Sequence, residues 1–175
     1  MDWRNFEQQW FAQASRALSA LAAANPEERL YGAAFHLFYS DGAKVLAPAF
    51  AANVESAVRV EAWGSTRYEP PEWKWDVIDE ASAAMASQYE ALTAEFVGHQ
   101  DRSDAILNDH DHAIARVCRA LTSAGRKGDI HRALPADFVA VIIEGQRRED
   151  EMRALVRASV DPQVLASLPE LAEQA

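Results

Sequence analysis

The stretch LYGAAFHLFYSDGAKVLAPA, residues 30–49, decides the fold of this 175-residue chain. From Leu30 to Tyr39 nearly every position is apolar or aromatic, which is typical of a central strand covered on both faces. Ser40-Asp41-Gly42 follows, and Asp-Gly readily takes the positive φ angles of a tight hairpin turn. We therefore predict a β-hairpin whose partner strand runs from Lys44 to Ala49 and is broken near Pro48.

The segment before the hairpin has the spacing of an amphipathic helix. Its apolar side chains recur at every third or fourth position, at Trp3, Phe6, Trp10, Phe11, Ala14, Leu18 and Leu21. Asp2 can cap the start of this helix by accepting backbone N–H bonds, and Asn25-Pro26 ends it.

The segment after the hairpin is predicted to hold a helix and then an aromatic arm. Asn53 stands where it could cap a helix from Val54 to Trp63, which Gly64 would close. Two prolines exclude a helix at Pro70-Pro71, so we predict a short strand or extended arm from Ser65 to Tyr68, followed by a turn packed on the core.

The rest of the chain alternates helices with one more buried strand. We predict a long helix from Ile78 to Gly98, and then a helix that begins at Ser103 or only after Asn108 and stops at Ala124-Gly125. A strand is predicted from Phe138 to Glu144. It is followed by a helix from Gln146 to Val160 and a short helix from Asp161 to Leu168. This order predicts a single α+β domain over residues 1–175, with a small antiparallel or mixed sheet flanked by five or six helices.

Composition narrows the partners and the compartment. A net charge of −10 repels nucleic acid and anionic lipid and favours a basic protein partner. Short basic clusters occur only at Arg126-Lys127 and Arg147-Arg148.

The one cysteine, Cys118, falls in a helical pattern and is predicted to be a buried apolar residue. The N-terminus lacks the pattern of a signal peptide and no stretch is long enough to cross a membrane, so we expect a cytoplasmic protein with no cofactor.

Several landmarks resemble one bacterial family, known as domain of unknown function four-three-zero-three. They are the aromatic strand ending in Phe38-Tyr39-Ser40-Asp41-Gly42, then Pro48, Asn53-Val54-Glu55, Arg67-Tyr68-Glu69-Pro70-Pro71-Glu72-Trp73 and the closing Asp161-Pro162. Val54 departs from the small hydroxylated residue expected there. The resemblance implies a fold and brings no catalytic residues, and small acidic domains of similar appearance serve as immunity proteins by analogy only.

The aromatic arm supplies the predicted partner-binding residues. Tyr68, Glu72, Trp73 and Trp75 lie on a segment made rigid by proline, and aromatic side chains on such a segment can anchor a partner at little entropic cost. The alternative is that these aromatics close the core over one edge of the sheet.

The string Asn108-Asp109-His110-Asp111-His112 holds the types of side chain that bind metals. His110 and His112 diverge on a helix, so only Asp109 and His112, three apart, could share an ion, with His36 or His131 as a distant partner. The competing interpretation is a solvated loop and helix start. His36 itself is predicted to be a buried strand histidine with one hydrogen-bond partner.

Function is predicted from what the sequence holds and lacks. It has no Gly-rich phosphate loop, no Gly-x-Ser-x-Gly, no His-Glu-x-x-His and no Cys-x-x-Cys motif. We predict a protein-binding module, most concretely an acidic immunity-type inhibitor that covers a basic toxin or effector. The alternatives are a small metal-dependent hydrolase that uses the Asp109/His112 region, and a housekeeping scaffold without specific chemistry. The sequence leaves the oligomeric state open.

Overall fold

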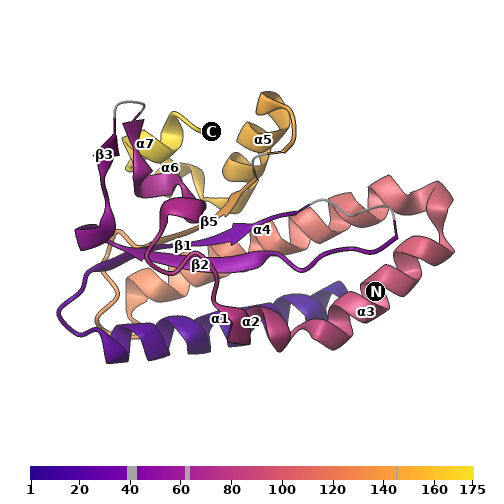
Figure 1. The fold of residues 1–175 in the computed structure, drawn as a ribbon, viewed down its shortest axis with the longest axis horizontal. Helices are drawn as coiled ribbons and strands as arrows, with labels where there is room; N and C mark the ends of the chain where they lie inside the picture. The colour runs from indigo at the N-terminus through magenta and orange to yellow at the C-terminus, as the bar shows by residue number, and fades with distance from the viewer. Residues whose placement is uncertain (39–42, 62–63, 145) are drawn as a thin grey trace.

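The structure, a computed structural model, describes residues 1–38, 43–61, 64–144 and 146–175. At its centre lies a three-stranded mixed sheet with strand order β2-β1-β5, made of β1 (Leu30–His36), β2 (Ala49–Val54) and β5 (Val139–Ile143). Figure 1 shows helices on both faces of this sheet, with the first helix on one side and the C-terminal helices on the other. The predicted α+β class is therefore confirmed.

Strand β1 is the central strand, as predicted, but its antiparallel partner is not the predicted one. Phe35 pairs with Phe50 and His36 with Ala49, so the partner strand starts where the predicted strand Lys44–Ala49 ends. Pro48 lies just outside the strand, which fits its lack of a ladder N–H group. The predicted turn at Ser40-Asp41-Gly42 lies outside the described residues.

The predicted helix from Val54 to Trp63 is wrong, because Asn53 and Val54 belong to β2. The amide of Asn53 does not cap a helix: it donates to the Tyr31 hydroxyl at 3.0 Å and accepts from the Lys74 N–H group at 3.1 Å. Short elements follow, namely η1 (Glu55–Ala57), β3 (Val60–Glu61), β4 (Gly64–Ser65), η2 (Thr66–Tyr68) and η3 (Pro70–Glu72).

Four helices of the described chain cover the first face of the sheet: α1 (Trp3–Ala24), α2 (Asp79–Ala83), α3 (Ala86–Gly98) and α4 (Ser103–Lys127). The short η4 (Gln100–Arg102) lies between α3 and α4. The Asp2 cap of α1 is confirmed, with a bond of 3.1 Å from the Asn5 N–H group. The helix predicted from Ile78 to Gly98 is two helices. The break lies at Ala84-Met85, where the Met85 N–H group bonds to the Ser82 carbonyl in a tight turn.

Helix α4 begins at Ser103, which is the earlier of the two predicted starts. It ends at Gly128 in the left-handed region, at φ 78°, and not at the predicted Ala124-Gly125. Glycine at position 125 serves packing instead, because a Cβ atom there would lie only 2.5 Å from the Phe138 ring.

The second face of the sheet is covered by α5 (Glu149–Ser159), α6 (Pro162–Ala166) and α7 (Pro169–Ala172). Helix α5 starts later than predicted, because the buried Glu144 carboxylate accepts the N–H groups of Gln146 and Arg147 and holds the chain in a turn. Two separate apolar cores result. The larger joins α1, α2, α3 and α4 to the sheet, and the smaller joins the aromatic arm and α5–α7 to the opposite face.

Candidate partner-binding surface

The negative charge of the protein is concentrated in one part of the chain. Residues 75–115 contain nine Asp or Glu residues and one Arg, so they carry −8 of the net charge of −10. This segment comprises α2, α3, η4 and the N-terminal half of α4. In Figure 1 the end of α3 and the start of α4 meet at the tip of the molecule farthest from α6 and α7. We call this part the acidic end.

Most of the carboxylates of the acidic end are exposed, and only Glu95 and Asp111 form an ion pair among the described residues. Seven of them are exposed and, within the described parts of the chain, none of the seven forms an ion pair: Asp76, Asp79, Glu80, Glu90, Asp101, Asp104 and Asp109. Elsewhere many acids lie against bases, as Glu55 does against Arg67 at 2.6 Å and Glu28 against Lys74 at 2.8 Å, although Glu27, Asp129 and Glu173 form no ion pair within the described residues. The field of the acidic end is therefore available to a partner.

An apolar groove adjoins the acidic end. It lies between α1 and α2 and encloses about 530 Å³. Small and aliphatic side chains form its wall, among them Ala17, Leu21 and Ala24 of α1 and Ala81 and Ala84 of α2. Glu80 stands at its rim. Apolar floor beside charged rim is the anatomy of a protein interface, in which a few buried anchors supply affinity and charges supply orientation.

A buried polar chain fixes the acidic end to the rest of the fold. The Trp10 indole donates to the Tyr89 hydroxyl at 3.3 Å, and that hydroxyl lies 2.8 Å from His110 Nε2. His110 Nδ1 lies 3.2 Å from Asp111 Oδ1, and Asp111 Oδ2 pairs with Arg147 at 2.6 Å. This series of polar contacts thus joins α1, α3, α4 and the β5–α5 loop.

Each donor in this chain has an acceptor if His110 is neutral and protonated on Nδ1. Tyr89 then donates to Nε2, and Nδ1–H donates to Asp111. Burial raises the pKa of Tyr89 well above its ordinary value, so the phenol stays protonated. His110 is only 4% exposed and packs against the Phe6 ring. Tyr89, His110 and Asp111 are all buried, and none of the three lines the groove between α1 and α2.

Of the predicted partner-binding residues, Tyr68 and Trp73 lie on the second face of the sheet, while Trp75 packs against the larger core. Tyr68 is 4% exposed and Trp73 5% exposed, and both belong to the smaller core. Trp75 is half-buried, bridges to Ala52 of β2 and carries the Lys74 ammonium 5.0 Å above its ring. Glu72 is exposed and pairs with Arg59. The packing of Tyr68 and Trp73 fits the alternative interpretation, in which these aromatics close the core over the sheet.

Both residues of the predicted metal-binding pair, Asp109 and His112, are exposed to solvent. Asp109 and His112 lie on the outside of α4, while the residues between them, His110 and Asp111, point inward. Residues 108–112 therefore lie within helix α4, and not in the solvated loop of the competing interpretation. Among the residues that the structure describes, no group of three His, Cys, Asp or Glu side chains is arranged to hold a metal ion.

The two remaining singled-out residues are His36 and Cys118. His36 is half-buried beside the Phe38 ring at the end of β1, and burial lowers its pKa. Cys118 is fully buried, as predicted, and burial raises the pKa of its thiol, which makes it a poor nucleophile.

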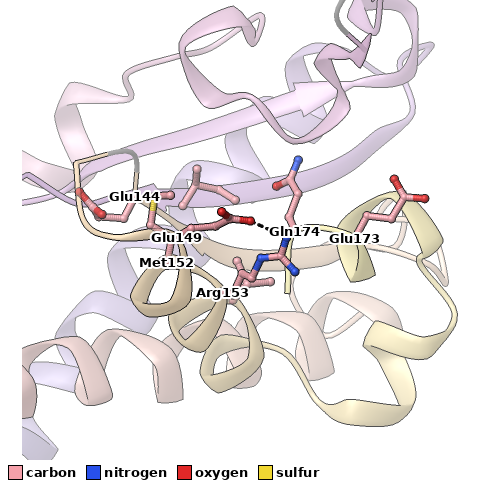
Figure 2. A pocket seen from close by; sticks show the side chains of 8 residues that line it. Glu144, Glu149, Met152, Arg153, Glu173 and Gln174 are labelled. Carbon is pink, nitrogen blue, oxygen red and sulfur yellow. Dashed lines mark hydrogen bonds and ion pairs between the residues drawn. The ribbon is translucent and has the colours of Figure 1, made fainter.

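A hollow of about 290 Å³ lies at the end of β5 (Figure 2). Glu149 and Arg153 reach into it, joined to each other at 2.7 Å, and Met152 and Gln174 close its sides. Glu144, at one edge, uses both carboxylate oxygens on backbone N–H groups. Three of its charged groups, Glu144, Glu149 and Arg153, thus already have partners within the protein, and the fourth, Glu173, is exposed at its edge.

No family model, curated protein or solved structure matches this chain. In the part of the chain that the structure describes, no helix has both the length and the apolar character that crossing a bilayer requires.

Proposed function

We propose that this protein is a protein-binding module that covers a basic surface of its partner, in the manner of an acidic immunity-type inhibitor of a toxin or effector. The observation that carries the proposal is the segregation of charge: seven exposed carboxylates, which form no ion pair with any residue that the structure describes, gather on or beside α2, α3, η4 and the start of α4. A surface that served only solubility would not need them in one segment, because dispersed charge achieves the same end.

The groove between α1 and α2 supplies the second part of such an interface. Its occupant would be an apolar side chain or short amphipathic helix of the partner, flanked by Lys or Arg residues. Glu80 in the groove wall and its neighbour Asp79 favour such basic flanks on the α2 side, while Arg16 is the base in the wall on the α1 side. An apolar anchor in the groove would hold the complex, and the acidic end would speed its formation.

We further propose a bacterial setting for this role. In that setting the partner would be the product of a neighbouring gene. The buried chain from Trp10 to Arg147 supports the proposal as well, because it holds the acidic end in a fixed position before binding.

The test is a pulldown from the native host with three matched baits. The first bait is the wild type. The second, the acidic-end variant, carries Asp79→Asn, Glu80→Gln and Glu90→Gln. The control carries Glu27→Gln, Asp129→Asn and Glu173→Gln, three exposed acids outside residues 75–115. The two variants lose the same charge, so they differ only in where it is lost.

We expect the wild type and the control to recover the same basic protein in stoichiometric amount, and the acidic-end variant to recover much less of it. Recovery of no stoichiometric protein, or equal recovery by all three baits, would count against the proposal. Thermal unfolding of each bait shows that the substitutions leave the fold intact.

A further inference from the structure

The C-terminal half of α4 has the opposite charge to its N-terminal half. Residues 116–127 contain four Lys or Arg residues and no acid, a net charge of +4 in a protein of net charge −10. Arg119, Arg126 and Lys127 recur at helical spacing and line one hollow of about 340 Å³, which α6 closes with Asp161 and Val164. This volume suits a small ligand.

The three cations of this hollow are free of carboxylate partners. Within the described residues, Arg119 and Lys127 form no hydrogen bond or ion pair. Arg126 donates to the Phe138 carbonyl at 2.8 Å and to the Asp137 carbonyl at 3.4 Å, so its guanidinium is held in place while its charge stays unneutralised. Several other arginines lie against acids, as Arg67 and Arg116 do, whereas Arg4 and Arg16 of α1 form no ion pair within the described residues and line no common hollow with a second base.

The C-terminal end of a helix attracts basic residues, and this explains part of the cluster. Arg126 and Lys127 lie in the last turn of α4, where positive charge opposes the helix dipole. Arg119 lies two turns earlier and gains nothing from that effect. Its position on the same face, with the Ser123 hydroxyl between it and Lys127, points to a ligand that several donors bind together.

We propose that this hollow binds the phosphate group of a small phosphorylated molecule, of the class of sugar phosphates. Guanidinium and ammonium groups are the side chains that bind phosphate oxygens best. The Arg126 guanidinium, fixed by backbone carbonyls, would provide a preorganised donor, and Ser123 an additional hydroxyl donor. The inference is independent of the proposed partner binding, which concerns the other end of α4.

The remainder of the ligand would lie against α6. The Asp161 carboxylate accepts the Gln163 N–H group through Oδ1 at 2.9 Å, which leaves Oδ2 to accept a ligand hydroxyl. Val164 supplies an apolar contact beside it. A carboxylate there repels a bare anion and favours an ester whose phosphate is joined to a hydroxyl-bearing group.

The test is isothermal titration calorimetry of the full chain at low ionic strength, with ribose 5-phosphate and inorganic phosphate as probes. The test variant is Arg119→Gln with Lys127→Gln, and the matched control is Arg4→Gln with Arg16→Gln, two exposed arginines of α1. A second test variant, Ser123→Asp, places a negative charge in the hollow while leaving the basic residues unchanged.

We expect the wild type and the control to bind ribose 5-phosphate equally, and more tightly than inorganic phosphate. Both test variants should bind it at least tenfold more weakly. The proposal is overturned if the wild type shows no binding at millimolar ribose 5-phosphate, if inorganic phosphate binds as tightly, or if the test variants bind as the control does.

Discussion

The Tyr89 hydroxyl links two otherwise separate polar groups, since it accepts from Trp10 and lies against His110. We expect Tyr89→Phe to leave both groups buried without a partner and to lower the free energy of unfolding by about 2 kcal/mol. Urea denaturation of Tyr68→Phe is the matched control, because the Tyr68 hydroxyl forms no hydrogen bond with the described residues. A cost for Tyr89→Phe no greater than that of Tyr68→Phe would show that the polar chain contributes little to stability.

His36 gives stability a dependence on pH. Burial lowers its pKa below the ordinary 6.5, against the opposing charge of Glu144. As pH falls through 6.5, the unfolded chain binds a proton that the folded protein takes up only at lower pH, so stability decreases and then levels off below the folded-state pKa. Denaturation between pH 8 and about pH 5 should therefore show a smaller loss for His36→Gln than for the wild type. Parallel curves would contradict this assignment.

At the scale of elements, α4 and β5 meet without space for a side chain at position 125. A Cβ atom on Gly125 would lie 2.5 and 2.9 Å from two carbons of the Phe138 ring, which is itself fully buried. Gly125→Ala should therefore destabilise the protein by about 1–3 kcal/mol, despite the better helix propensity of alanine. Gly98→Ala, also helical and with nothing within 4 Å, should be neutral or stabilising when both are compared by thermal unfolding.

The elements that could be predicted from the sequence are those whose pattern is local. Helix α1 carries its own apolar periodicity and cap, strands β1 and β5 are short continuous apolar runs, and each was found near its predicted bounds. Strand β2 was missed because Asn53 imitates a helix cap, and its true partners, the Tyr31 hydroxyl and the Lys74 N–H group, are distant in the sequence.

The candidate site shows the same limit. His110 was assigned to a solvated string, although Ile106 and Ile114, four positions before and after it, mark the inward face of the helix. The acids of residues 75–115 can be counted in the sequence. Their gathering at one end cannot, because it depends on how α3 turns back into α4 (Figure 1). The groove between α1 and α2 likewise joins segments that lie far apart in the chain.

At the scale of the whole molecule, the charge changes sign along α4: residues 75–115 carry −8 and residues 116–127 carry +4. For the complex with the captured partner, we expect the association rate at low ionic strength to fall about tenfold on Asp79→Asn, Glu80→Gln and Glu90→Gln, and also on adding salt. Stopped-flow mixing measures both effects. The control variant, with its three substitutions outside the acidic end, should associate almost as fast as the wild type.

The central claim is that the partner covers α2, α3 and the start of α4. Hydrogen exchange of the free protein and of the complex tests it most directly, because backbone amides that binding covers exchange more slowly. The account predicts added protection in α2, in α3, in the first turns of α4 and along the α1 face of the groove, with α5, α6 and α7 unchanged. Protection confined to α5–α7 or to the aromatic arm around Trp73 would contradict it.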